Sequence, residues 1–273
     1  MGETTDPLQN SMLEDPMLDM NHLRTEIDRV DNSLLGLIAE RLDLSRAVRR
    51  AKSGARVWRP SREASLVRDL AENSEDTSPH LVSRIWAELL SASLALQGPM
   101  RLHIALEGDA LEVWTLVRDR FGAAIPALSY PTASSALAAA YAEDEGVAVL
   151  PAPGGMNSWW SALCSGGATP EMSILSGLPV VGNDSWPRAV AVATADRAPS
   201  GDDMTLIGLK NVKAVSGSGL SGILRAEAGD NSLVTLEGYF DEASDEFQKI
   251  QSLDSSAKII GCLPKPLSES GTL

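Results

Sequence analysis

Two basic side chains stand where apolar ones are expected in the stretch from Asn21 to Lys52. Apolar residues recur there at steps of three and four, which is the pattern of an amphipathic helix. Arg41 falls where the next apolar residue is due, and Lys52 lies within about 20° of it around the helix. A buried cation is costly unless an anion meets it, so the pattern indicates a site for an anionic molecule. The alternative is that both side chains extend to solvent at the edge of a core.

A helix further along the chain adds two neutral polar groups. Ser78 followed by Pro79 is typical of an N-cap and a first helical residue. Ser93 and Gln97 then lie one turn apart, on or beside the apolar stripe of this helix. Two cations, a hydroxyl and an amide facing inward from two helices could hold an anionic, oxygen-rich small molecule inside a bundle.

Three helices must position these groups. The first, over 21–52, would be roughly 45 Å long, which is more than one small domain can cover and so favours a partner chain. The second is predicted from Ser61, as its cap, to about Glu72, with Arg62 and Glu63 in its first turn. That pair either forms a solvated ion pair or points at a polar ligand. The third helix runs to Gln97, and Gly98-Pro99 follows it.

Four sequence blocks in this segment, taken together, resemble the all-helical (AroQ-type) chorismate mutases. They read LRTEIDRVDNSLLGLIAER, AVRRAK, RPSREASLV and SASLALQ, in the order and spacing of that family. The resemblance covers residues 21–98 and implies a dimer in which two chains interlace their long helices. It also implies that each site receives one arginine from the neighbouring chain, which by position is Arg24.

The resemblance implies a role for each matching residue in the rearrangement of chorismate to prephenate. Lys52 and Gln97 would donate hydrogen bonds to the ether oxygen, and Glu63 would accept one from the ring hydroxyl. The two carboxylates would be held by Arg24 from the neighbour, Arg41, Arg62 and Ser93. The reaction is intramolecular and implies no cofactor and no metal.

From Arg101 the periodicity changes to an alternation of strands and helices. Strands are predicted over 101–106, 124–130 and 146–151, with helices over 109–121 and 134–146, which indicates a parallel sheet. Residues 101–200 resemble a degenerate first lobe of the prephenate dehydratases. The Thr-Arg-Phe motif of that family would fall on Pro187-Arg188-Ala189. Proline has no hydroxyl, so we expect no dehydratase activity.

Residues 201–265 resemble a degenerate ACT-type regulatory domain. Strands are predicted over 204–209, 232–240 and 257–263, and helices near 219–228 and 243–253. The resemblance implies that an aromatic amino acid could act as an effector. The end segments, 1–20 and 266–273, are expected to be disordered tails, and either Met1 or Met20 could be the start.

Composition narrows the class of protein. The net charge of −14 argues against nucleic acid as a partner. Residues 21–98 nevertheless hold 12 Lys and Arg against 11 Asp and Glu, so the basic residues gather where an anionic ligand is expected. No apolar run approaches the ~20 residues of a membrane span, and two cysteines fit a reducing cytoplasm. Three scattered histidines give no metal-ligand spacing.

These observations predict an α + α/β protein, in which a three-helix chorismate mutase domain precedes a smaller α/β region. Two other functions stay open at this point. One is an isochorismate pyruvate lyase, which shares the helical fold, although the Arg62-Glu63 and Ser93/Gln97 set favours the mutase. The other is a non-catalytic regulatory protein that senses an aromatic amino acid. The α/β region could be a sensor, a scaffold or an inert remnant.

Overall fold

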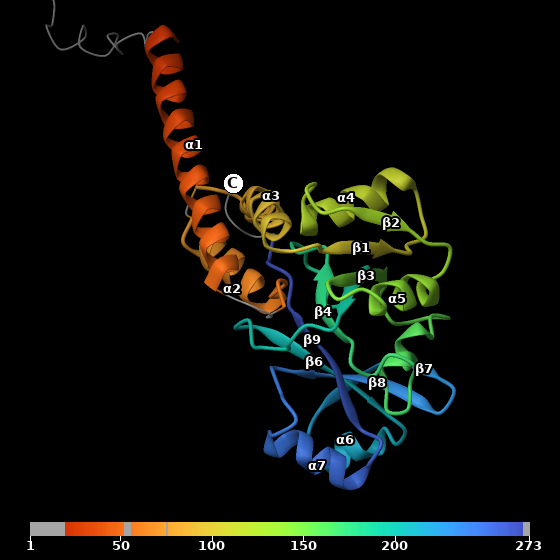
Figure 1. Ribbon diagram of the computed structural model, residues 1–273. Helices are drawn as coiled ribbons and strands as arrows, with labels where there is room; N and C mark the ends of the chain where they lie inside the picture. The colour runs from red at the N-terminus through yellow and green to blue at the C-terminus, as the bar shows by residue number, and fades with distance from the viewer. Residues whose placement is uncertain (1–19, 52–55, 75, 270–273) are drawn as a thin grey trace, which may run out of the picture.

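The chain folds into three N-terminal helices followed by an α/β region, as the sequence predicts (Figure 1). The prediction that the α/β region is the smaller part is wrong, because its strands and helices run from Arg101 to Pro264. The computed structural model describes residues 20–51, 56–74 and 76–269. The helices are α1 (Met20–Ala51), α2 (Pro60–Glu72) and α3 (Pro79–Gln97). The predicted tail before Met20, the end of the chain after 269 and Lys52 lie outside the described residues.

The starts of α2 and α3 are fixed by different residues. The Ser78 hydroxyl accepts a hydrogen bond from the Leu81 amide at 3.3 Å, which confirms it as the N-cap of α3. The predicted cap of α2 at Ser61 is wrong, because the helix already begins at Pro60 and its N-cap is Arg59. Proline suits a first helical position, where the missing N–H would have no partner in the helix. Ser61 is therefore a buried residue of the first turn.

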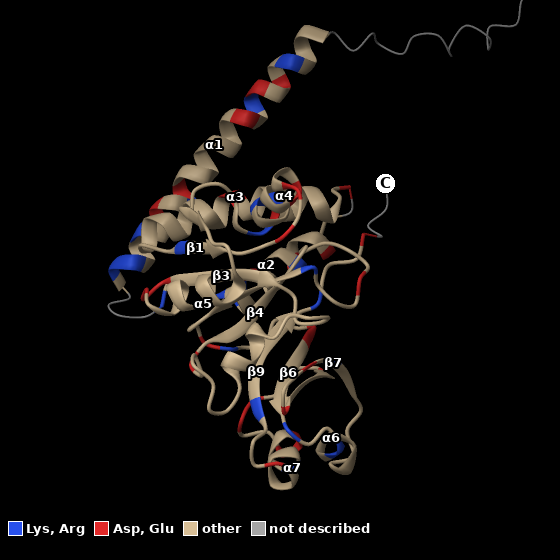
Figure 2. Cartoon of the chain, turned by 90° about the vertical axis from the view of Figure 1, so that its right-hand side faces the viewer, with Lys and Arg blue, Asp and Glu red and all other residues tan. Residues whose placement is uncertain are grey.

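The apolar stripe of α1 is open to solvent in the described chain. No residue of this 32-residue helix is buried, and its exposed apolar side chains keep 41 to 65% of their surface. They are Ile27, Val30, Leu34, Leu35, Leu37, Leu44 and Val48. Only one end of α1 lies against α3, while the rest extends beyond the body of the protein, as Figures 1 and 2 both show.

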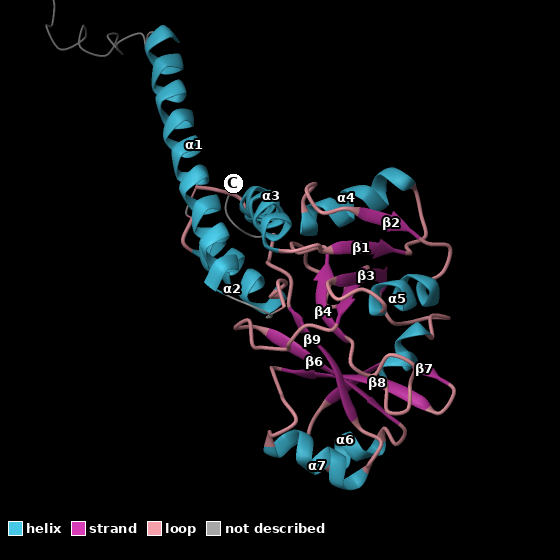
Figure 3. Cartoon of the chain, in the orientation of Figure 1, coloured by secondary structure: helices cyan, strands magenta, loops and turns pink. Residues whose placement is uncertain are grey.

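The α/β region is built on one sheet of nine strands among the described residues, in the order β2-β1-β3-β5-β4-β9-β6-β8-β7. The strands are β1 (Arg101–Ile104), β2 (Ala127–Ser129), β3 (Gly146–Pro151), β4 (Ser173–Leu178), β5 (Ala189–Ala193), β6 (Asp203–Leu209), β7 (Gly222–Ala228), β8 (Asn231–Glu237) and β9 (Lys258–Pro264). The helices are α4 (Ala110–Phe121), α5 (Ala133–Tyr141), α6 (Lys213–Gly217) and α7 (Asp245–Leu253), with a 3-10 helix, η1 (Trp159–Leu163). Helices α6 and α7 lie at the opposite end of the sheet from α4 (Figure 3).

The parallel sheet predicted for the three strands between residues 101 and 151 is confirmed, although the nine-stranded sheet as a whole is mixed. Strands β1, β2 and β3 pair in parallel, whereas β5 runs antiparallel to β3 and to β4. The predicted helix near 219–228 is wrong, because β7 occupies 222–228 and pairs antiparallel with β8. The two-residue turn Gly229-Asp230, with Gly229 at φ +58°, joins these strands. Such a turn between two apolar runs is a hairpin signal, and it overrides the helix pattern.

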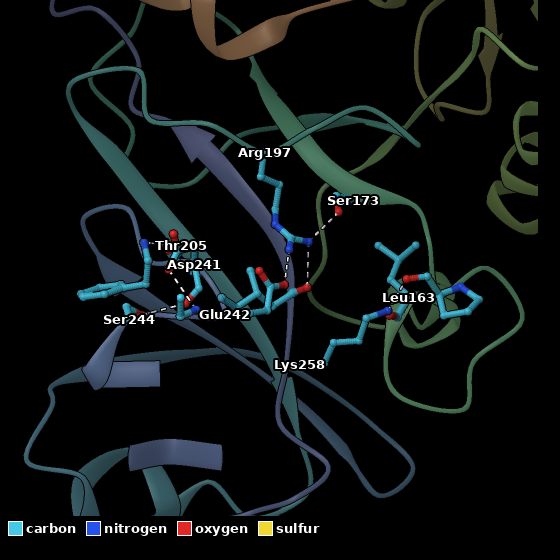
Figure 4. Close-up of polar contacts among 12 residues, drawn as sticks. Leu163, Ser173, Arg197, Thr205, Asp241, Glu242, Ser244 and Lys258 are labelled. Atoms are coloured by element: carbon cyan, nitrogen blue, oxygen red, sulfur yellow. Dashed lines mark hydrogen bonds and ion pairs between the residues drawn. The ribbon is translucent and has the colours of Figure 1, made fainter. Parts of the chain in front are cut away.

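Both predicted parts of the α/β region contribute to this sheet and share a core. Arg197 donates to the Ser173 hydroxyl on β4 at 3.0 Å and to the Ile259 carbonyl on β9 at 3.2 Å, and it also pairs with Glu242 (Figure 4). Burial lowers the pKa of Lys258, which donates to the Leu163 carbonyl at 2.6 Å. The predicted boundary near residue 200 lies between β5 and β6, inside one sheet, and the division into two domains stays a prediction.

The described part of the predicted C-terminal tail is packed rather than free. Leu267 is buried, its amide donates to the Val180 carbonyl at 2.8 Å, and its carbonyl accepts from the Gly182 amide at 2.9 Å. Arg68 on α2 donates to the Lys265 carbonyl at 2.9 Å. Extended backbone that pairs in this way gains the hydrogen bonds that a disordered tail would make with water.

One hydrophobic core joins the helical domain to the α/β region. Trp58, which precedes α2, and Leu94 of α3 pack in the same buried cluster as Leu102 of β1 and Phe121 of α4. At the end of α4, Gly122 has a φ of +61° and lies directly against α3. A Cβ at this position would stand 2.7 Å from the Ser91 Cβ and 2.8 Å from the Ala87 carbonyl oxygen.

We expect Gly122→Ala to destabilise the protein by about 2–4 kcal/mol, since it combines an unfavourable positive φ with overpacking against α3. Gly155→Ala is the matched control, because Gly155 also has a positive φ, +56°, but nothing lies within 4 Å of the point that its Cβ would occupy. The control should lose no more than about 1–2 kcal/mol. Chemical denaturation of both variants measures their free energies of unfolding. Equal losses of stability would show that α3 and α4 do not pack closely at this position.

Candidate active site in the helical domain

Arg41 and Ser93, which the sequence predicts at one site, are in contact. The Arg41 Nη1 on α1 donates to the Ser93 hydroxyl on α3 at 2.7 Å and to the Leu89 carbonyl at 3.0 Å. The Ser93 hydroxyl in turn donates to the Leu89 carbonyl at 2.8 Å. The Ser45 hydroxyl donates to the Ser93 hydroxyl at 3.1 Å. Arg41 is half-buried and Ser93 is buried, so the pair lies in the seam between α1 and α3.

The electrostatics of Arg41 favour an anion beside it. Burial lowers the pKa of the Arg41 guanidinium from its ordinary value, and the Glu63 carboxylate partly opposes this effect. A guanidinium keeps its charge under these conditions, so the loss of hydration is a cost to the folded chain. An anionic ligand at Arg41 would offset that cost.

Gln97 lies at a helix end near this seam. Gln97 is the last residue of α3, one turn beyond Ser93, and is half-buried. Beside it, Arg49 of α1 donates to the Leu96 carbonyl at 2.9 Å, which holds the ends of the two helices together. Lys52 follows the last residue of α1 directly, but the structure does not describe it.

Arg24 is far from the other predicted site residues of its own chain. It is exposed near the start of α1, 17 residues before Arg41, which corresponds to about 25 Å along a helix. That end of α1 extends away from the body (Figure 1). Within one chain the structure therefore does not bring Arg24 to Arg41.

Arg62 and Glu63 point to different surroundings. Arg62 is exposed and lines a cleft with Arg56, Arg59 and Asp196. Glu63 is buried, and its Oε2 accepts hydrogen bonds from the indole N–H of Trp58 at 3.3 Å and from Arg120 of α4 at 3.0 Å. The structure does not bring Arg62 into contact with Arg41.

Arg120 and Trp58 are partners of Glu63 that the sequence interpretation missed. Arg120 follows Val113 and Val117 at helical spacing, so it falls on the inward face of α4. A cation on an apolar face is the signal that points to Arg41, and it could have pointed to Arg120 as well. Nothing in the sequence indicates which carboxylate Arg120 would meet.

At the motif position of the dehydratases, Arg188 is on the surface. Its side chain is 62% exposed and pairs with Glu112 of α4 at 3.5 Å.

Among the described residues, no group of three His, Cys, Asp or Glu side chains could hold a metal ion. No helix in the described ranges is both long and apolar enough to cross a membrane.

Two curated relatives resemble part of this chain, and both are bifunctional chorismate mutase/prephenate dehydratases. The protein from Stutzerimonas stutzeri is 33% identical over 95 residues, which is 32% of this chain and 26% of that protein. The protein from Neisseria gonorrhoeae is 27% identical over 111 residues, which is 40% of this chain and 30% of that protein. The matched regions thus cover less than a third of either relative's length.

Two solved structures share 11% identity and a TM-score of 0.41 with this chain. One is a prephenate dehydratase from Streptococcus mutans, matched over 60% of this chain and 97% of that one. The other is GqqA, described as a novel type of quorum-quenching acylase, matched over 62% of this chain and 96% of that one. Likenesses at this TM-score support no conclusion about fold or function.

The comparison that bears on the site is with a protein family. The model of the family "Chorismate mutase type II" matches residues 23–98, which span α1, α2 and α3. This match confirms the resemblance drawn from the sequence blocks. Residues 23–98 are a chorismate mutase type II domain, joined in this chain to an α/β region.

Proposed function

We propose that this protein is a chorismate mutase that converts chorismate to prephenate in the cytoplasm, for phenylalanine and tyrosine synthesis. Two facts support the proposal, namely the family match over residues 23–98 and the fusion seen in the named relatives. The observation that carries it is the contact between Arg41 and Ser93 at 2.7 Å. A half-buried cation held by a hydroxyl is suited to binding one carboxylate of a dianion.

The proposed chemistry is positioning and charge stabilisation. The carboxylates would be held by Arg41, Arg62, Ser93 and the partner's Arg24, which fold the substrate into its reactive conformer. Lys52 and Gln97 would donate to the ether oxygen as negative charge grows on it, and Glu63 would accept a hydrogen bond from the ring hydroxyl. No nucleophile or proton donor takes part.

The active form in this proposal is a homodimer. The apolar stripe of α1 is 41 to 65% exposed, and Arg24 is about 25 Å along the helix from Arg41. A second copy that laid its own α1 along this stripe would bury apolar surface and bring its Arg24 to the first copy's site. One arrangement thus accounts for both the open stripe and the incomplete site.

Incubating the full chain with chorismate, and following the loss of chorismate, tests the activity directly. Formation of prephenate supports the proposal, and no loss of chorismate by a folded dimer contradicts it. Release of pyruvate from isochorismate would instead identify a lyase. Repeating the assay with phenylalanine or tyrosine tests whether the α/β region senses an aromatic amino acid.

We expect activity to return when two inactive variants are mixed. Arg24→Ala removes the donated arginine and Arg41→Ala removes the resident one, so each variant alone should be inactive. Hybrid dimers contain one site with both arginines. Assays after subunit exchange should therefore recover part of the parent activity, and no recovery despite demonstrated exchange would contradict the shared site.

Gln97→Glu should make the reaction dependent on acid pH. A neutral amide donates at any pH, whereas a carboxyl group donates only while it is protonated. Turnover should fall as the new carboxyl group ionises, by about 10²–10³ at neutral pH. Gln251→Glu, on α7, is the control and should keep the parent's pH–rate profile. A Gln97→Glu profile identical to the parent's would remove Gln97 from the site.

We expect no dehydratase activity, because Pro187 stands where the threonine hydroxyl of the motif belongs. Prephenate supplied to the full chain should form phenylpyruvate no faster than in buffer. Formation above that background would show that another residue performs this step. A mutase assay on the same preparation controls for misfolded protein.

A further inference from the structure

A buried cation of the α/β region reaches into the helical domain. Arg120 of α4 is 8% exposed, and its Nη2 donates to the Glu63 Oε2 at 3.0 Å. Both side chains of this ion pair are more than nine-tenths buried, at 9% and 8% exposure. Breaking such a pair from one side leaves an uncompensated buried charge, so each partner constrains the other strongly.

Three further contacts fix Arg120 in place. Its Nε donates to the Ser176 hydroxyl on β4 at 2.9 Å. Its guanidinium carbon lies 5.7 Å from the ring centre of Trp58 and 5.0 Å from that of Phe121. These are cation–π distances, and they leave little freedom to a planar group. The orientation of Arg120 is thus set by the sheet and by α4.

Only one oxygen of the Glu63 carboxylate accepts hydrogen bonds from the described residues. Trp58 and Arg120 both donate to Oε2, and the described residues offer no hydrogen bond to Oε1. Glu63 also lines a narrow cleft between the helices and β4. A carboxylate that is held in one orientation and is free at one oxygen can accept a hydrogen bond from a hydroxyl group.

We propose that Arg120 is a positioning residue, which holds the Glu63 carboxylate in the orientation that accepts a hydrogen bond from substrate and so makes the mutase site depend on the α/β region. This inference rests on the proposed role of Glu63 as acceptor for the ring hydroxyl. Arg120 itself does not touch substrate. The other charged groups around Glu63 are Arg41 on α1, Arg68 on α2, Asp119 on α4 and Lys265 after β9.

The test compares Arg120→Gln, Glu63→Gln and the double variant in the full chain. Arg120→Gln should lower kcat/KM by about 10- to 100-fold, with the same division between kcat and KM as Glu63→Gln. The kcat/KM of the double variant should be within about two-fold of that of the less active single variant, since both changes remove the same interaction. Additive losses, or a different division, would overturn the inference.

Arg84→Gln is the matched control. Arg84 of α3 pairs with Asp119 of α4 at 3.1 Å across the same interface, but its side chain is 57% exposed and does not touch Glu63. An exposed pair contributes little, so this variant should keep parent activity. Arg120→Lys, which retains the charge, should recover part of the activity that Arg120→Gln loses.

The division of the loss between kcat and KM separates positioning from a general loss of structure. A misplaced Glu63 carboxylate should change both constants in the proportion that Glu63→Gln does, whereas a loss of folded protein only lowers the amount of active enzyme. A loss of activity that merely follows the folded fraction, measured by chemical denaturation, would mean a structural role and would overturn the inference. If Arg120→Gln does not fold, Ser176→Ala, which keeps Arg120 but frees its Nε, should show a smaller loss with the same division, and parent behaviour there overturns the inference.

The outcomes also separate this inference from the proposed function. A folded parent chain that does not consume chorismate overturns both. A parent that consumes chorismate, with Arg120→Gln folded and equally active, overturns only the role of Arg120.

Discussion

The need to compensate buried positive charge governs how the helical domain meets its surroundings. Arg41 on α1 and Arg120 on α4 both turn inward, and Glu63 on α2 acts on both, through its field at Arg41 and through an ion pair with Arg120. One carboxylate cannot fully offset two cations in a medium of low dielectric. The remaining positive charge lies on Arg41, beside the Ser93 hydroxyl, which is where an anionic substrate is proposed to bind.

The helical domain also has apolar side chains on α1 that are not buried within the described chain. Helix α1 has a periodic apolar stripe, yet none of its residues is buried in the described chain, whereas Trp58 and Leu94 nearby are buried against the α/β region. The helical domain therefore has two different interfaces. The interface with the α/β region is complete within the chain, whereas the stripe on α1 is exposed and is where we propose that a second copy packs.

Sequence patterns predicted those features that depend on local spacing. The three helices, the cap at Ser78 and the approach of Arg41 to Ser93 all follow from the period of 3.6 residues. The patterns did not predict the Arg120–Glu63 pair, because its partners are 57 residues apart and only the tertiary fold decides which cation meets which carboxylate. Strand β7 was mistaken for a helix because its apolar residues fit both periods, and only the Gly229-Asp230 turn distinguishes them.

The hydrogen bond from Arg68 to the Lys265 carbonyl has a consequence for how the protein is made. Its two partners are 197 residues apart, so α2 leaves the ribosome long before the segment that holds it. Contacts of such long range form late, because the entropy of closing the intervening loop must be overcome first. During synthesis α2 therefore lacks its C-terminal support, and its apolar residue Val67 stays open to association until Leu267 has been made and packs against it.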